Sequence, residues 1–112
     1  MHETALAEGI LRIATDAAAN NNAARITEVG LIIGQMSGVE TEALEFAFRF
    51  LAKGTLADGA QLVIERKPLV ARCDRCGRQT HLSEYNFFCP ECGGVLKIIS
   101  GREMQVAYVE AD

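Results

Sequence analysis

Four cysteines carry the strongest chemical signal in this sequence. They form two C-x-x-C pairs, Cys73 with Cys76 and Cys89 with Cys92, and twelve residues separate the pairs. Each pair can chelate a metal ion through a tight turn. Four thiolates in a tetrahedron match Zn(II), and a site closed by four protein ligands leaves no open position for a substrate. The pattern therefore predicts a structural zinc site.

The segment that holds the cysteines, residues 72–98, is too small to build a useful hydrophobic core. Gly77 and Gly93 follow the two pairs directly, and glycine tolerates the positive φ that turns backbone N–H groups toward thiolates. Metal binding contributes about 10–16 kcal/mol in zinc-finger peptides, more than so small a core could supply. The other side chains expected near the metal are apolar covers (Leu82, Phe87, Phe88) and arginines that compensate its charge (Arg72, Arg75, Arg78).

Two other uses of four cysteines stay open at this point. Iron in the same arrangement would make an electron carrier of the rubredoxin kind, but a short polar loop attached to a larger domain favours zinc. Disulfides are rare in the cytosol, where we expect this chain because no segment has a signal-peptide layout. His81 lies between the pairs, and we expect it to be exposed or to support the metal only indirectly.

The first three residues hold a second set of potential ligands. The α-amine of Met1, the backbone nitrogen of His2 and the His2 imidazole can close a five-membered and then a six-membered chelate ring. The amide or carboxylate of Glu3 can add a fourth donor. Nitrogen-rich planar sites suit Ni(II) or Cu(II). A histidine at position two, taken alone, is more often a frayed and solvated residue.

The composition is typical of a folded soluble protein. Of the 112 residues, 49% are hydrophobic and 23% are charged. The net charge of −4 disfavours binding to a phosphate backbone, so we expect no nucleic-acid partner. Apolar runs such as GLIIG are too short to cross a bilayer. The sequence also contains no serine–histidine–acid set and no phosphate-cradling glycine loop, which disfavours an enzyme.

Hydrophobic periodicity predicts the elements that must position these residues. Apolar spacings of three and four predict a helix over 4–20, and alternation predicts a strand over 25–34. Ser37 and Glu40 fit a capping box that opens a second helix at about 40–53. Two more strands are expected, QLVIERKPLV and GREMQVAYVEA, with Pro68 marking the end or the exposed edge of the first.

These elements predict an α+β fold with a small three-stranded sheet and two helices on one face. A zinc-ribbon-like four-cysteine module, residues 72–98, is inserted between the second and third strands, and the α/β domain comprises 1–71 and 99–112. The core stripe of the second helix is formed by Leu44, Ala47, Phe48 and Leu51. Phe46 and Phe50 form a second apolar stripe beside it, so we expect this helix to be tucked deep against the sheet. The chain is a monomer or a homodimer, and a dimer that swaps the module is conceivable.

The whole sequence resembles the HypA/HybF family, accessory proteins that help insert nickel into nickel–iron hydrogenases. The resemblance covers nearly the whole chain. It rests on the opening Met-His-Glu before an apolar helix, on VGLIIGQMSGVETEALEFAF, on DGAQLVIE and on the order of the four cysteines. It implies that Met1, His2 and Glu3 bind Ni(II), with His2 essential. It also implies that the four cysteines hold a structural Zn(II): Cys73, Cys76, Cys89 and Cys92.

The function that the resemblance implies is that of a nickel metallochaperone, not of an enzyme. Its partners would be a nickel GTPase accessory protein and the hydrogenase large subunit, in the cytoplasm. Residues 1–71 and 99–112 would then form the nickel-binding domain. The alternative is a zinc-ribbon module that binds nucleic acid or transcription machinery, which explains the cysteines equally well but predicts a basic face.

Overall fold

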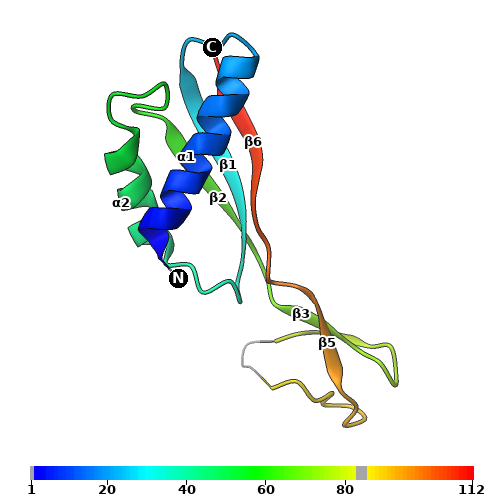
Figure 1. Cartoon of the computed structure of the whole chain (residues 1–112). Helices are drawn as coiled ribbons and strands as arrows, with labels where there is room; N and C mark the ends of the chain where they lie inside the picture. Colours follow the sequence, from blue (N-terminus) through cyan, green and yellow to red (C-terminus); the bar gives the residue numbers. More distant parts are fainter. Residues whose placement is uncertain (1, 83–85) are drawn as a thin grey trace. The chain divides into compact units, whose positions relative to one another are not determined.

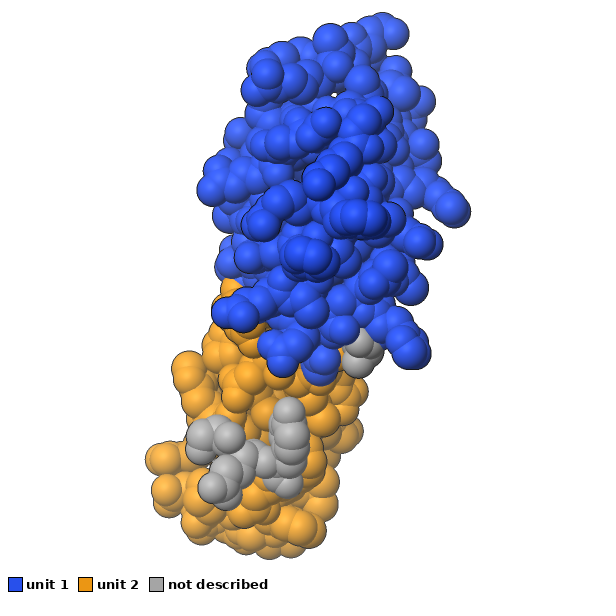
Figure 2. Space-filling model, turned by 90° about the vertical axis from the view of Figure 1, so that its left-hand side faces the viewer, with its two compact units in different colours: residues 1–32, 38–65, 105–112 blue, residues 33–37, 66–104 orange. Residues whose placement is uncertain are grey.

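The computed structural model describes residues 2–82 and 86–112. The chain forms two compact units, coloured separately in Figure 2. The first comprises residues 1–32, 38–65 and 105–112, and the second comprises residues 33–37 and 66–104. In the described part of the chain, neither helix is long and apolar enough to span a membrane.

The larger sheet has three strands in the order β2-β1-β6. These strands are β1 (Ile26–Gly34), β2 (Gln61–Lys67) and β6 (Met104–Ala111). The helices are α1 (Glu3–Asn20) and α2 (Thr41–Ala52). The two helices pack on each other and on one face of this sheet (Figure 1). The predicted α+β arrangement of two helices on a three-stranded sheet is therefore confirmed.

The core of the first unit lies between the helices and the sheet. The apolar side of α1 is built mostly from alanine, which lets the helix approach its neighbours closely. The buried residues include Ala7, Ile10, Ala14 and Ala18 of α1, Leu44, Ala47, Phe48 and Ala52 of α2, and Ile26, Val29 and Leu31 of β1. Most helical stability in proteins comes from such packing of an apolar face, so these residues hold the two helices in place.

The second apolar stripe of α2 does not face the core, and here the prediction was wrong. Phe46 is 69% exposed and Phe50 is 63% exposed, whereas Phe48 is 1% exposed. A helix advances about 100° per residue, so positions two apart from Phe48 lie on nearly the opposite side. The core therefore accepts one arc of α2 and leaves the other aromatic residues in solvent.

The predicted capping box at Ser37 was also wrong. Helix α2 begins at Thr41 with Glu40 as the N-cap residue, and the Glu40 side chain makes no capping hydrogen bond. Gly38 has a φ of +76° and Glu40 is extended, so residues 38–40 cannot form a first helical turn. The glycine that the box places inside the helix instead turns the chain before it.

The second unit contains a sheet of its own, in the order β4-β3-β5. Its strands are β3 (Val70–Cys73), β4 (Gln79–His81) and β5 (Leu96–Ser100), and both pairings are antiparallel. The sequence predicted one strand over 61–70, but β2 ends at Lys67. Pro68 lacks the N–H that a continuing ladder needs. The chain resumes as β3, which belongs to the second sheet.

Candidate metal centres

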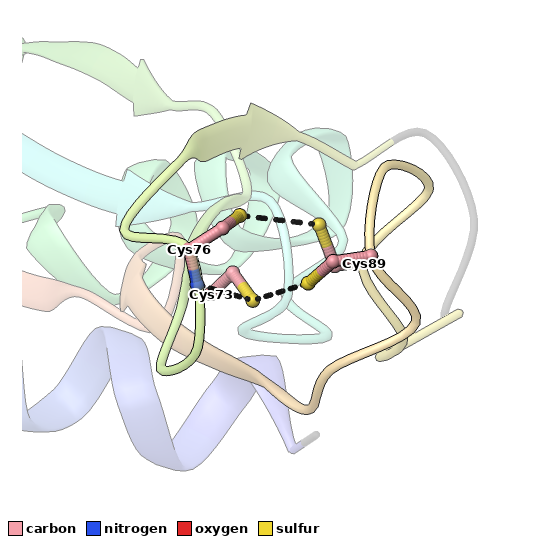
Figure 3. Close-up of side chains that lie close together, drawn as sticks. Cys73, Cys76 and Cys89 are labelled. Carbon is pink, nitrogen blue, oxygen red and sulfur yellow. Dashed lines mark hydrogen bonds between the residues drawn. The ribbon is translucent and has the colours of Figure 1, made fainter.

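The four cysteine thiols converge on one point. Their Sγ atoms all lie within 4.8 Å of one another. The sulfur of Cys73 is 3.4 Å from that of Cys92. The sulfur of Cys76 is 3.8 Å from that of Cys89, and both of these residues are labelled in Figure 3. Zn–S bonds of about 2.3 Å in a tetrahedron place the sulfurs about 3.8 Å apart. The donor set and its spacing therefore fit Zn(II).

Two equivalent turns present the thiols. Cys73 ends β3, and the Gly77 N–H donates to the Cys73 carbonyl at 2.9 Å. In the second turn the Gly93 N–H donates to the Cys89 carbonyl at the same distance of 2.9 Å. Gly77 has a φ of +74° and Gly93 a φ of +73°, a conformation that favours glycine. The positive φ predicted for these two glycines is confirmed.

Backbone N–H groups stabilise negative charge on one sulfur in particular. The Cys73 Sγ accepts the N–H of Arg75 at 3.4 Å and that of Cys76 at 3.5 Å. Led by the Cys76 N–H, these bonds lower the pKa of Cys73 to about 6. The Gly94 N–H acts in the same sense on Cys92, but the neighbouring Cys73 sulfur and burial outweigh it and raise the pKa of Cys92 to about 11. The cluster favours at least one thiolate at neutral pH.

Gly94 is a residue of this site that the sequence analysis missed. A Cβ built on it would lie 3.0 Å from the Cys73 Sγ, 3.1 Å from the Arg75 Cβ and 3.4 Å from the Cys92 Sγ. A side chain here would press on two of the four sulfurs. The sequence signal that could have found it is the pair of glycines after Cys92. Gly93 is needed for the turn, so the second glycine, Gly94, calls for another explanation.

The sequence predicted apolar covers and charge-compensating arginines around the metal, and these side chains have the following contacts. Leu82 packs against a buried cluster formed by Ala71, Cys73, Cys89 and Leu96, whereas Phe88 is 62% exposed and does not cover the site. Arg78 pairs with Glu91 at 3.3 Å, and Arg75 donates to the Cys92 carbonyl at 3.3 Å. His81 is exposed on β4 and is not part of the thiol cluster.

The N-terminal ligand set lies at the start of α1. His2 is the N-cap of the helix, with its side chain exposed, and its carbonyl accepts the Leu6 N–H at 3.1 Å. His2 and Glu3 line a groove of about 410 Å³ together with Thr4, Ala43, Phe46 and Ala47. Met1 lies outside the described residues. His2 is thus held in solvent beside α2.

The carboxylate of Glu3 reaches α2. Its Oε2 accepts the backbone N–H of Glu40 at 3.0 Å. This bond is the largest cause that lowers the pKa of Glu3, followed by the Glu3 backbone N–H, so the group is ionised at neutral pH. Nothing in the sequence signalled this contact, because the two residues are 37 positions apart.

Comparison with known proteins places the chain in a family. A family model described as "Hydrogenase/urease nickel incorporation, metallochaperone, hypA" matches residues 1–111. Proteins named "Hydrogenase maturation factor HypA" match over the full chain, with 42% identity in Albidiferax ferrireducens over all of that protein. The one from Aquifex aeolicus is 38% identical over 98% of its length.

Solved structures support the same fold. The chain is similar to "Solution structure of the Ni metallochaperone HypA from Helicobacter pylori", with a TM-score of 0.69, 23% identity, and coverage of 99% of this chain and 97% of that one. It is also similar to "Solution structure of HypA protein", with a TM-score of 0.74 and 23% identity over 99% and 96% of the two chains. From the family match and the full-length relatives, this chain belongs to the HypA family of nickel-incorporation metallochaperones that act in hydrogenase maturation.

Proposed function

We propose that this chain binds one Ni(II) ion at its N-terminus and delivers it to a nickel–iron hydrogenase during maturation. The proposed donors are the Met1 α-amine, the His2 backbone nitrogen and imidazole, and a donor from Glu3. The observation that carries the proposal is the place of His2, exposed at the N-cap of α1 in a family defined by nickel incorporation.

The helix start suits such a chelate for a physical reason. The first N–H groups of an α-helix have no acceptor within the helix, so the amides of His2 and Glu3 can lose their protons to a metal without breaking a helical hydrogen bond. The partial positive charge at this end favours the anionic amide nitrogens. A chelate formed there leaves the Leu6 N–H bond to the His2 carbonyl in place.

We propose a structural role for the cysteine site, with Zn(II) held by Cys73, Cys76, Cys89 and Cys92. Four converging sulfurs at zinc-like separations support this assignment. Residues 72–98 then form the zinc-binding module, and 1–71 with 99–112 form the nickel-binding domain. The zinc would brace the small second sheet and take no part in the transfer of nickel.

A delivery protein must release its cargo, and an exposed terminal chelate can be displaced one donor at a time. We therefore infer that the chain acts as a carrier and not as an enzyme. Its partners in this proposal are a nickel GTPase accessory protein, which loads or triggers it, and the hydrogenase large subunit, which receives the ion. None of these four cysteines forms a disulfide, which fits a reducing compartment, so we place the delivery in the cytoplasm.

The matched pair His2→Ala and His81→Ala tests the nickel site. Both histidines are exposed, and each substitution removes one imidazole. In the untagged chain, His2→Ala should weaken Ni(II) binding by more than about 10-fold, since even loss of a group that only supports a ligand costs that much. His81→Ala should bind nickel as the parent does. Equal affinity in the His2→Ala variant would refute the proposed site.

A further inference from the structure

The second sheet has two unlike faces. Successive residues of a strand point to opposite sides of a sheet, and directly opposed residues of antiparallel strands point to the same side. Cys73 is opposite Leu96 and Ala71 is opposite Ile98. Cys73, Ala71 and Leu96 all belong to the buried cluster beside the thiols. One face of β3 and β5 therefore looks toward the cysteine site, and the intervening positions of both strands form the other face.

This other face carries large apolar side chains in solvent. Val95, Lys97 and Ile99 alternate with the buried and half-buried positions of β5. Val95 forms a bridge with Phe88, so these two side chains lie on the same side. Phe88 is 62% exposed, Val95 57% and Ile99 48%. Single exposed apolar residues are ordinary, but a group of them on one face marks an interaction site.

Two cations stand among these apolar residues. Lys97 lies between Val95 and Ile99 along the chain, and Arg72, also exposed, is opposite Lys97 on β3. Lys97 pairs with Asp74 at 3.4 Å, but the two side chains are 73% and 52% exposed, so the pair is weak and can be exchanged for another carboxylate. The outer face of the second sheet, as we call it, consists of Arg72, Phe88, Val95, Lys97 and Ile99.

The two units carry formal charges of opposite sign. The second unit has seven Lys and Arg residues and four Asp and Glu residues, a formal charge of +3. The first unit has four basic and eleven acidic residues, a formal charge of −7. Four thiolates with one Zn(II) would reduce the charge of the second unit from +3 to +1, which is still positive. The basic residues of an acidic chain are thus concentrated in the unit that holds the outer face.

A basic and apolar face selects an acidic protein segment over a nucleic acid or an anionic membrane. Charges are screened beyond about 8 Å at physiological ionic strength, so a short segment on the outer face is attracted mainly by Arg72 and Lys97. A long polyanion also meets the rest of the chain, whose net charge is −4. Nucleic-acid binding relies on many cations at phosphates, whereas the core of a protein interface is apolar with aromatic and Arg side chains.

We propose that the outer face binds a segment of a partner protein in which Asp or Glu alternates with large apolar side chains. Its carboxylates pair with Arg72 and Lys97, and its apolar side chains cover the three exposed apolar residues of the face. The thiols point to the opposite side of the sheet, so the zinc site is not altered by binding. The inference goes beyond the nickel-delivery role, because it requires neither nickel nor the N-terminal residues.

A labelled peptide in which glutamate and leucine alternate is the probe, and the zinc-loaded full chain is the receptor. Fluorescence anisotropy measures the affinity. Phe88→Ala should weaken binding by roughly 10-fold, as expected for an aromatic residue at the centre of an interface. Phe50→Ala is the matched control, because Phe50 is 63% exposed, much like Phe88 at 62%, but lies on α2 in the first unit. It should bind the peptide as the parent does.

A second pair tests the charges. Lys97→Glu should weaken binding by roughly 10-fold and make it less sensitive to added salt, because an attraction is replaced by a repulsion. Arg12→Glu makes the same change of charge at an exposed position of α1 and should have little effect. Zinc content checks that each variant retains its module. In the parent, amide signals of Val95, Lys97 and Ile99 should shift on titration with the peptide.

The proposal fails if the peptide shows no saturable binding up to about 1 mM, or if Phe88→Ala and Phe50→Ala lose affinity equally. A peptide with lysine in place of glutamate should not bind, and equal binding of the two peptides would also contradict the proposal. Single-stranded RNA and phosphatidylserine vesicles test the other partner classes. Tighter binding of either, lost in Lys97→Glu but kept in Phe88→Ala, would assign the face to a polyanion. A chain that bound the peptide but no nickel would refute only the proposed function.

Discussion

At the scale of single residues, the thiol cluster depends on a position that is not a ligand. A Cβ at Gly94 would lie 3.0 Å from the Cys73 Sγ. Gly94 does not have a positive φ, so its backbone conformation accepts alanine. We expect Gly94→Ala to displace two sulfurs and weaken zinc retention by roughly 10-fold. Transfer of zinc to a chromogenic chelator measures this. Gly9→Ala, with no atom within 4 Å of the added Cβ, is the control. Equal transfer rates in the two variants would contradict the prediction.

A second residue-scale prediction concerns Tyr108, whose ring covers Gly30 on β1. The Tyr108 hydroxyl donates to the Glu28 carboxylate, which raises the pKa of Tyr108 to about 12. The neutral phenol is favoured by folding, so this contribution to stability is complete below the ordinary pKa of 10.0 and is lost as the pH rises through about 12. Glu28→Gln should lower the pKa of Tyr108 toward 10.0. Phenolate absorbance, corrected with Tyr108→Phe for the other tyrosine, measures it, and an unchanged titration would refute the assignment.

The cysteine cluster could be predicted from sequence because its geometry is local within each half. Each C-x-x-C pair with its glycine closes a turn by a bond between positions four apart, Gly77 to Cys73 and Gly93 to Cys89. Gly94 could not be predicted in the same way, since its constraint comes from Cys73 across the module. The contact between Glu3 and Glu40 was missed for the same reason.

At the scale of elements, α2 shows how much a hydrophobic pattern leaves open. Leu44 and Phe48 were correctly assigned to the core stripe, but the pattern did not show that the sheet covers only one arc of the helix. Composition alone cannot distinguish a buried aromatic residue from an exposed one on a helix that is apolar over a wide arc. The predicted bounds of α2, about 40–53, agree with the structure to within one residue, but the predicted cap does not. Ser37 and Glu40 match a capping box whose glycine adopts a positive φ.

The two sides of α2 should respond very differently to truncation. Phe48→Ala should destabilise the chain by about 3–5 kcal/mol, because the side chain is buried and leaves a cavity. Phe46→Ala should change the free energy of unfolding by less than about 0.5 kcal/mol, because its side chain is in solvent. Urea unfolding of the zinc-loaded protein compares them. Similar losses in both variants would show that Phe46 is packed.

At the scale of the whole molecule, the two units have different sources of stability. The first has helices packed on a sheet around an apolar core, and the second has a buried cluster in which Cys73 and Cys89 stand beside Ala71 and Leu96. Structural Zn(II) supplies about 10–16 kcal/mol in zinc-finger peptides, so with zinc held at this site, as proposed, we expect the second unit to depend on the metal for its fold.

Removal of zinc should therefore unfold one unit and spare the other. After treatment with a strong chelator, amide signals from β3, β4 and β5 should lose their dispersion in an NMR spectrum. Signals from α1 and α2 should stay in place. Added Zn(II) should restore the dispersed signals of β3, β4 and β5. Retention of the dispersed β3 and β5 signals in metal-free protein would show that zinc is not what holds this sheet together.

The central claim is that a free amino end and the adjacent imidazole together hold nickel. The most direct measurement is a Ni(II) titration of the untagged chain beside one whose α-amine is acetylated, followed by calorimetry and native mass spectrometry. We expect the untagged chain to bind one ion, and the acetylated chain, with the same four cysteines and the same His2, to bind it far more weakly. Equal affinity and stoichiometry in the two proteins would contradict the claim.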